Sequence, residues 1–321
     1  MSDCRPNLPE SSSHSLDVLV MGSLLVELVP AESGQALVDM TRLIPTASGA
    51  AANFAQALAA LGPRVGMFTR VGDDELGAWL RRRLERGGID TQTVLATPGQ
   101  LTPVSFASAD LLGGKQFTFY RFPGYSDPMG AVSAASLEAA SLTRARLFDF
   151  TEAVVRPRQV REVAFRAARW CREAGGTVVY AVNYRPQSWD LSLPEIAAVQ
   201  REAISLAHIA LMNEEEYQVI FGEGAGPAGV GGGTTLVVTA GDRGGWVQEG
   251  GRRRPFAPCP VAVQYDVGAG DSFHAGYVAA YLEGRPPAEA ARFAAACAAL
   301  KISRPAGAPP PSREEVLAFM G

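Results

Sequence analysis

The stretch YDVGAGDSFHAGY, residues 265–277, decides the prediction of the fold. Gly268 and Gly270 flank an alanine, and Asp271 comes next, at the start of a run of small, aliphatic and aromatic residues typical of a buried helix. A glycine-rich turn that leads into a helix exposes backbone N–H groups, with the positive end of the helix dipole behind them. The stretch therefore predicts an anion-binding turn, although an aspartate N-cap behind a flexible turn is the structural alternative.

Such a turn suits phosphoryl transfer. The N–H groups of Gly268, Ala269 and Gly270 would stabilise negative charge on the moving phosphoryl group. The carboxylate of Asp271, in the first helical turn, would accept the proton of an attacking alcohol. These four residues form the predicted catalytic group.

Outside this stretch, short β-branched runs alternate with longer, alanine-rich runs of helical period. The first kind includes DVLVMG, VGMFTRVG, TVVYAVN, HIALMN and TTLVVTAG, and the second includes AANFAQALAALG and VREVAFRAARWCREAGG. This alternation is typical of βαβ units. It predicts an α/β fold with a doubly wound, mostly parallel central sheet flanked by helices.

Two regions, residues 25–46 and 92–125, interrupt the alternation. The second contains PVSFASAD and KQFTFYRF, a pattern that predicts a hairpin. We expect both to form a small β-sheet lid that excludes water from a site beneath it. The predicted parts are a disordered tail at 1–15, an α/β core at 16–24, 47–91 and 126–321, and a β lid at 25–46 and 92–125.

Composition excludes several classes of protein. Lys and Arg number 29 and Asp and Glu 33, a net charge of −4, and no basic face large enough for nucleic acid is evident. No stretch approaches the roughly 18 apolar residues of a membrane span, and the polar N-terminus lacks the apolar core of a signal peptide. Four cysteines without a CxxC pair and only three histidines argue against zinc, and they indicate reduced thiols in a cytoplasmic protein.

Several ordered motifs resemble those of the ribokinase family of sugar kinases, also called the PfkB family, from about residue 17 to 320. They are SGAAANFAQALAALG, RVGDDELG, NEEE, TAGDRGG, GAGDSFHAGY and RPAGAPPPSREEVLAF. The resemblance implies a ribokinase-like fold in which the core binds ATP with Mg²⁺ and the lid covers a sugar. It also implies that Asp271 is the general base and that residues 268–270 form the anion hole.

The resemblance assigns further residues to the nucleotide. Asn213 and Glu216 match an Asn-x-x-Glu element that handles the ATP phosphates through Mg²⁺, with Glu216 acting through water; an N-cap beside a surface glutamate is the alternative. A nucleotide loop is matched by Thr239, Gly241 and Gly244. Asn183 follows a predicted strand, at the edge where α/β sheets bind ligands, and we expect it to contact the cofactor.

Sugar recognition falls on the first half of the chain. Gly49 and Asn53 match a GG-x-x-x-N element whose first glycine is Ser48 here, and the Asn53 amide can both donate to and accept from hydroxyl groups. Glu27 falls where the family often has an acidic residue that binds sugar hydroxyls.

Two arginines bear on the identity of the sugar. Arg121 in the predicted lid and Arg185 after a core strand could together grip a carboxylate. Their segments resemble those of 2-keto-3-deoxygluconate kinases, which makes this acidic sugar the favoured substrate. Ala181 and Phe119 depart from that pattern, where an Asp and a Tyr are usual. A fructokinase, a ribokinase-like enzyme or a 5-dehydro-2-deoxygluconokinase would share most of the same residues.

Tyr265 bears on a second ion. The family often has at this position an Asp that helps to hold K⁺, and Asp266 would point elsewhere from an extended segment. A requirement for K⁺ is therefore in question. The exposed strands of the lid also suggest a homodimer.

Rival functions fit the residues less well. GDSF at 270–273 resembles an esterase motif, but the only later histidine, His274, adjoins it, which leaves no separate base. The glycine-rich run at 222–233 follows a predicted helix rather than a strand, so it does not match a dinucleotide fold, and no P-loop motif is present. A sugar-binding protein of the same fold without catalysis remains open.

Overall fold

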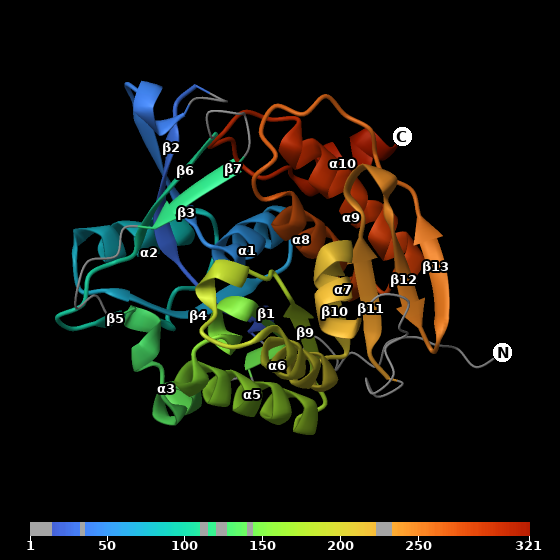
Figure 1. Cartoon of the computed structure of the whole chain (residues 1–321), viewed down its shortest axis with the longest axis horizontal. Helices are drawn as coiled ribbons and strands as arrows, with labels where there is room; N and C mark the ends of the chain where they lie inside the picture. The colour runs from blue at the N-terminus through green and yellow to red at the C-terminus, as the bar shows by residue number, and fades with distance from the viewer. Residues whose placement is uncertain (1–14, 33–35, 110–114, 120–126, 140–143, 223–232) are drawn as a thin grey trace.

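A large sheet runs through the centre of the molecule (Figure 1). The computed structural model describes residues 15–32, 36–109, 115–119, 127–139, 144–222 and 233–321. In these ranges the strands of the large sheet are β1 (Leu16–Met21), β4 (Val65–Gly72), β5 (Val94–Thr97), β8 (Ala145–Thr151), β9 (Thr177–Ala181), β10 (Ile209–Asn213), β11 (Thr235–Thr239), β12 (Gly245–Glu249) and β13 (Arg252–Phe256). Their order is β13-β12-β11-β10-β9-β8-β1-β4-β5, with parallel pairing except that β12 pairs antiparallel with both β11 and β13. The predicted, mostly parallel α/β sheet is confirmed.

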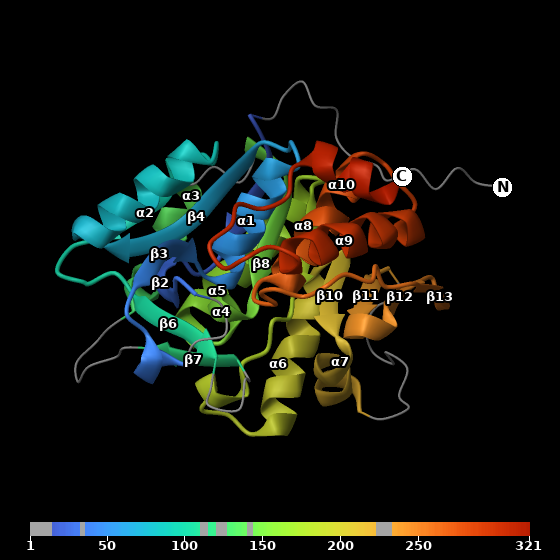
Figure 2. The same cartoon turned by 90° about the horizontal axis from the view of Figure 1, so that it is seen from above.

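Helices cover both faces of this sheet (Figure 2). One face carries α1 (Ala50–Ala60), α2 (Glu75–Arg86), α8 (Ala269–Leu282), α9 (Pro287–Ile302) and α10 (Arg313–Met320). The other carries α3 (Ala134–Ala139), α4 (Glu152–Val155), α5 (Arg158–Glu173), α6 (Leu193–Leu206) and α7 (Glu214–Phe221). Short 3₁₀ turns are η1 (Leu37–Asp39), η2 (Pro128–Ala131), η4 (Pro186–Ser188) and η5 (Gly241–Arg243). In the described part of the chain, no helix combines the length and apolarity needed to cross a bilayer.

The alternation of side chains along β1 explains why helices are needed on both faces. Val18 and Val20 pack into the core under α1, α8 and α9, whereas Leu19 and Met21 pack into the core under α5 and α6. Because both faces of the strand are apolar, each must be covered.

A smaller sheet projects from one end of the large one (Figure 1). Within the described ranges it contains β2 (Leu25–Pro30), β3 (Leu43–Ser48), β6 (Val104–Ala109) and β7 (Lys115–Phe119), in the order β3-β2-β6-β7. This is the small sheet expected from the sequence. The prediction was wrong for β5, which falls in the range 92–125 given to the lid but pairs with β4 at the edge of the large sheet.

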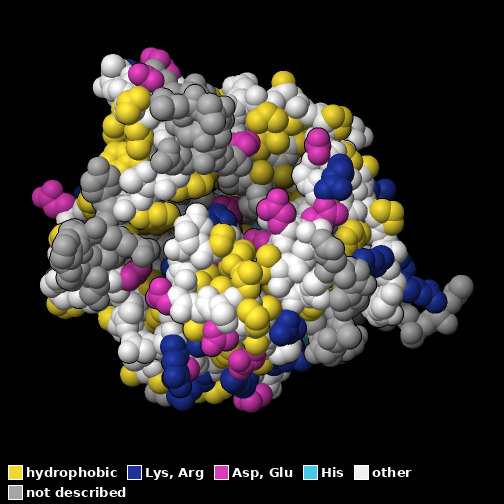
Figure 3. Space-filling model, in the orientation of Figure 1, with side chains coloured by type: hydrophobic (Ala, Val, Ile, Leu, Met, Phe, Trp, Pro, Cys, Tyr) yellow, Lys and Arg dark blue, Asp and Glu magenta, His cyan; other side chains and the backbone are white. Residues whose placement is uncertain are grey.

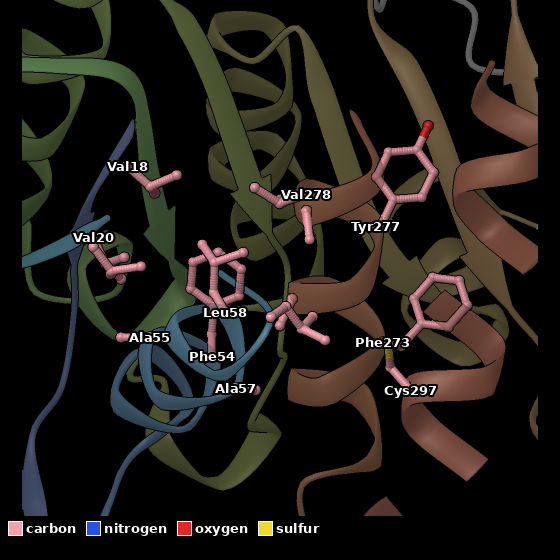
Figure 4. Packing of buried hydrophobic residues seen from close by; sticks show 14 of the residues in the cluster. Val18, Val20, Phe54, Ala55, Ala57, Leu58, Phe273, Tyr277, Val278 and Cys297 are labelled. Carbon is pink, nitrogen blue, oxygen red and sulfur yellow. The ribbon is translucent and has the colours of Figure 1, made fainter. Parts of the chain in front are cut away.

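Close packing of α1, α8 and α9 fixes the position of the stretch at 265–277. Phe54 and Leu58 of α1 lie between β1 and α8, and Phe273 lies beside Cys297 of α9 (Figure 4). A Cβ on Gly276 would come within 2.8 Å of the Ala294 Cα, so this glycine permits α8 and α9 to lie close together. Helix α8 is thereby packed against both α1 and α9.

Candidate active site

The start of α8 lies near one edge of the large sheet, where β1, β8, β9, β10 and β11 all end in the same direction. Ligands of open α/β sheets bind at this edge. Figure 3 shows a hollow on this face of the molecule, next to the small sheet, with acidic and basic side chains inside it. The side chains at the strand ends therefore form the candidate site.

Asp271 is held by two amides from distant parts of the chain. Asn53 Nδ2, in α1, donates to Asp271 Oδ2 at 2.9 Å, and Asn183 Nδ2, just after β9, donates to Oδ1 at 3.2 Å. Burial raises the pKa of Asp271, and the Asn53 hydrogen bond, Arg185, His274 and the Asn183 bond act in the opposite direction. The carboxylate is thus fixed in one orientation, in surroundings that favour holding a proton.

The turn before Asp271 leaves backbone donors available. Gly268 is the N-cap of α8 and has a φ of 84°, in the left-handed region. The N–H of Ser272 donates to the Gly268 carbonyl at 3.0 Å and begins the helical hydrogen bonds. The N–H groups of residues 269–271 precede it and have no acceptor within the helix. Apart from its chain neighbours and the backbone of its own helix, no described atom lies within 4 Å of a Cβ built on Gly270, so this side of the turn is open.

Glu27 lies on the small sheet beside this turn. Ser48 Oγ donates to its Oε2 at 3.2 Å and Ser105 Oγ to its Oε1 at 3.4 Å, and the side chain is only 8% exposed. Burial raises the pKa of Glu27; the two serines lower it, and the nearby Asp271 raises it further. Ser48, which replaces a glycine of the expected motif, therefore positions Glu27.

Gly49 has a conformational role. It is the N-cap of α1 with a φ of 105°, and a Cβ there would come within 2.6 Å of the Ser23 carbonyl oxygen. The Asn53 N–H donates to the Gly49 carbonyl at 2.8 Å. Gly49 thus places Asn53 in the first turn of α1, opposite Asp271.

Asn213 and Glu216 cap α7 reciprocally. The Glu216 N–H donates to Asn213 Oδ1 at 2.8 Å, and the Asn213 N–H donates to Glu216 Oε2 at 2.8 Å. Glu216 Oε1 also accepts from the Tyr184 N–H at 2.7 Å. Glu216 is buried, which raises the pKa of its carboxyl, whereas Asn213 is exposed. The alternative considered for this motif, an N-cap, is present, but with a buried glutamate instead of a surface one.

The surroundings of Glu216 fit a magnesium ion held through water. Among the described residues, no group of three or more His, Cys, Asp and Glu side chains could hold a metal ion. Mg²⁺ bound with a nucleotide usually takes its ligands from phosphates, water and one or two carboxylates. Since both oxygens of Glu216 already accept a backbone N–H, this carboxylate would contact bound water more readily than the ion itself.

The loop after β11 contains the other predicted nucleotide residues. Thr239 pairs in register with Asn213, so the two lie side by side at the strand ends. Gly241 is exposed, with a φ of 61° and open space around its Cβ position. Gly244 instead has a packing role, because a Cβ there would lie 2.2 Å from the Phe256 carbonyl oxygen.

Of the two arginines predicted to bind the sugar, the structure describes only Arg185. Arg185 is exposed, its Nη1 donates to the Tyr184 carbonyl at 3.2 Å, and its charge lowers the pKa of Asp271. Arg185 therefore lies near the proposed base. Arg121 lies outside the described residues.

A family model described as "pfkB family carbohydrate kinase" matches residues 15–313. The chain belongs to this family. It is 27% identical to fructokinase-1 of Oryza sativa subsp. japonica over 94% of this chain and 97% of the relative. It is 29% identical to an Escherichia coli fructokinase over 82% of this chain and 83% of the relative. A fructokinase structure with bound ATP from Xylella fastidiosa superposes with a TM-score of 0.83 at 24% identity, covering 94% and 98% of the two chains.

This pfkB-family kinase also has buried acids near the site that sequence reasoning missed. Asp149 Oδ2, on β8, lies 2.7 Å from His274 Nε2, and the His274 ring stacks on Phe54 at 3.9 Å. Glu152 follows β8 and accepts a hydrogen bond from Trp189. The available signal was an aspartate within the apolar run ARLFDF, which would be costly to bury without a partner.

Proposed function

We propose that this carbohydrate kinase transfers the γ-phosphoryl group of ATP to a hydroxyl group of a neutral ketohexose of the fructose type. The observation that carries the proposal is the carboxylate of Asp271, fixed by two amides beside a turn with free backbone donors. The names of the relatives favour fructose over 2-keto-3-deoxygluconate, the sugar favoured from sequence.

In the proposed reaction, Asp271 accepts the proton of the attacking hydroxyl while the N–H groups of residues 268–270 stabilise charge on the phosphoryl group. Asn213, Thr239 and Gly241 bind the nucleotide along the ends of β10 and β11. Magnesium would neutralise phosphate charge when bound, with Glu216 reaching it through water. Most of the rate comes from positioning and charge stabilisation.

Charge on the sugar side supports a neutral substrate. Asp271 lies close enough to Glu27 for its charge to raise the pKa of the Glu27 carboxyl group. The carboxylate of an acidic sugar would be a third negative group and would be repelled by these two. A neutral sugar, which has only hydroxyl groups, would not be repelled. Glu27, Asn53 and Ser48 would instead exchange hydrogen bonds with sugar hydroxyls.

An acidic sugar remains the second candidate because of Arg185. Its exposed guanidinium lies near Asp271 and could pair with a substrate carboxylate. The proposed partner in this grip is Arg121.

The test is ADP release by purified protein with ATP, Mg²⁺ and one sugar at a time: fructose, ribose, 2-keto-3-deoxygluconate or 5-dehydro-2-deoxygluconate. We expect the highest kcat/KM with fructose. Preference for the keto acid would transfer the assignment to the second candidate. If the protein phosphorylates none of these sugars although a non-hydrolysable ATP analogue still binds, a sugar-binding protein without catalysis would be favoured.

Asp271→Asn is the matched control for this experiment. It keeps the size of the side chain and removes the proton acceptor, so we expect sugar and ATP-analogue binding to stay within about threefold while kcat falls by about 10²–10⁴-fold. A kcat near that of the wild type would remove Asp271 from the proposed role.

We further propose that the small sheet acts as a lid on the α/β core and as the contact between two copies of the chain. β2 and β6 supply Glu27 and Ser105, which links the sheet to the sugar side. β7 is an edge strand on which Phe117 is 39% exposed. Edge strands with exposed apolar side chains favour pairing with another chain.

A further inference from the structure

Tyr265 and Lys301 form an unusual pair beside the glycine turn. Lys301 Nζ lies 5.8 Å from the centroid of the Tyr265 ring, within the range of a cation–π contact. Tyr265 lies between β13 and α8 in the sequence, whereas Lys301 belongs to the last turn of α9. The backbone ties the two together, because the Tyr265 N–H donates to the Ile302 carbonyl at 3.1 Å.

The residues here do not fit a bound potassium ion. The position that would supply a carboxylate holds a phenol, and burial raises the pKa of the Tyr265 hydroxyl, so it stays neutral. A neutral phenol cannot offset the charge of a metal ion as a carboxylate does. An ammonium group already lies against the ring.

Lys301 is also close to the proposed catalytic residues. Its Cε lies 3.5 Å from the position of a Cβ on Gly268. Burial and Arg304 lower the pKa of Lys301, and the carboxylates of Asp271 and Glu27 raise it. No described residue forms an ion pair or a hydrogen bond with its ammonium group. Within the part of the chain that the structure describes, this positive charge beside the turn thus has no anion bonded to it, and the carboxylates that act on it are those of Asp271 and Glu27.

We propose that the ammonium group of Lys301 is the fixed cation of the phosphoryl-transfer site and takes the place of a monovalent metal ion. The inference rests on the proposed role of residues 268–271. There the charge attracts the phosphoryl oxygens of the nucleotide and stabilises the charge that develops on them during transfer. The Tyr265 ring holds the ammonium in place without neutralising it.

Composition supports a specific use of lysine at this position. Of the 29 basic residues, only Lys115 and Lys301 are lysines and the other 27 are arginines. Lysine carries a compact point charge, whereas the guanidinium of arginine is broad and planar. We therefore expect arginine at position 301 to be a poor substitute for lysine.

The first experiment compares ADP release by the wild-type enzyme in chloride salts of K⁺, Na⁺ and tetramethylammonium, at equal ionic strength and with ATP, Mg²⁺ and the best sugar. The expected rates agree within about twofold. Activation by K⁺ of more than tenfold overturns the inference while leaving the proposed function intact. A wild-type enzyme that phosphorylates no sugar in any salt overturns the proposed function and the inference with it.

The second experiment removes the charge. Lys301→Met keeps an unbranched apolar stem, and we expect kcat to fall at least tenfold, with partial recovery on adding methylammonium. Lys115→Met, the same change at the other lysine, should keep the wild-type rate. A Lys301→Met enzyme with the wild-type kcat and thermal stability would overturn the inference.

A third measurement reports binding without turnover. After reductive methylation with ¹³C-formaldehyde, the two lysines and the N-terminal amine give separate NMR signals, and the signal that is lost in the Lys301→Met variant is that of Lys301. The Lys301 signal should shift on adding a non-hydrolysable ATP analogue and should stay fixed on adding K⁺. No shift with the saturating analogue would contradict contact between Lys301 and the phosphates.

Discussion

At the scale of single residues, the orientation of Asp271 depends on the amide of Asn183. Asn183 has a φ of 42°, and among the described residues it is the one non-glycine with a positive φ. Asparagine tolerates this backbone region better than most residues, and the turn directs its amide at Asp271 Oδ1. Local backbone strain is thus accepted where it positions the proposed base.

Asn183→Gly should lower kcat by about tenfold while leaving the backbone unstrained. The lost hydrogen bond lowers the pKa of Asp271 in the wild type, so its removal should move the acidic limb of the kcat/KM–pH profile to higher pH. Asn53→Ala should additionally raise the KM for the sugar. An unchanged pH profile in Asn183→Gly would exclude this role.

Two glycine-to-alanine changes should have opposite effects. Gly270→Ala puts a methyl group into open space, so stability should hold or rise, but kcat should fall because the methyl group faces the proposed phosphoryl site. Gly244→Ala should lower stability by about 1–3 kcal/mol, since its Cβ would clash with the Phe256 carbonyl at a positive φ. Thermal melts and ADP release on both variants test the contrast; normal kcat in Gly270→Ala would contradict it.

At the scale of elements, the buried Asp149–His274 contact ties β8 to α8. Burial raises the pKa of Asp149, and His274 lowers it. When one member of a buried pair is removed, the other stays buried without a partner to offset the cost of its burial. We expect Asp149→Ala to lower the free energy of unfolding by about 3–5 kcal/mol in urea titrations.

The control for this change is the more exposed Arg64–Asp17 pair, at 3.0 Å. Asp17→Ala should cost about 1 kcal/mol or less, since solvent screens the pair. Equal losses in the two aspartate variants would mean that burial does not set the strength of the Asp149–His274 contact.

Glu152, at the start of α4, should make stability depend on pH. Burial raises its pKa from 4.5 to about 7, so the folded state binds the proton more tightly than the unfolded state does. This contribution to stability is complete below pH 4.5 and is lost as the pH rises through 7.

Glu152→Gln keeps an oxygen that can accept from Trp189 and removes the titration. Between pH 5 and 8 the wild type should lose on the order of 2–3 kcal/mol relative to the variant. The measurement is urea unfolding of both proteins at several pH values. A difference between them that does not change with pH would show that Glu152 is ionised normally.

At the scale of the whole molecule, the small sheet should mediate dimer formation. Light scattering should give the wild type twice the 33.9 kDa mass of one chain, and Phe117→Lys, on edge strand β7, should give a single chain. Leu193→Lys, at an exposed position on α6, is the control and should stay dimeric. A monomeric wild type, or a dimeric Phe117→Lys, would assign the contact elsewhere.

Much of this fold could be predicted from the sequence pattern within single segments. Alternating apolar runs predicted the large sheet, and the interruptions between them predicted the small one, because both signals lie within single segments. β5 was misplaced since its four residues would suit either sheet, and only pairing with β4 decides between them. Short strands are ambiguous for this reason.

The sequence predicted in part which residues lie together at the candidate site, whereas their roles remain predictions. The turn at 268–271 has a glycine pattern that predicts its geometry, and the structure brings Glu27, Asn53 and Asn183 to it. The Asp149–His274 contact and the place of Lys301 were missed because each depends on residues from separate elements. No pattern within α9 distinguishes Lys301 from a solvated surface lysine.

The hydrogen bond between Asn53 and Asp271 spans 218 residues of sequence. At 5–20 residues per second, a ribosome adds the proposed base about 10–40 s after the amide that holds it. A nascent chain therefore contains the residues proposed to bind the sugar first and acquires the proposed proton acceptor near the end of synthesis. Chains that end before residue 271 lack the proposed base altogether, so we expect them to have no kinase activity.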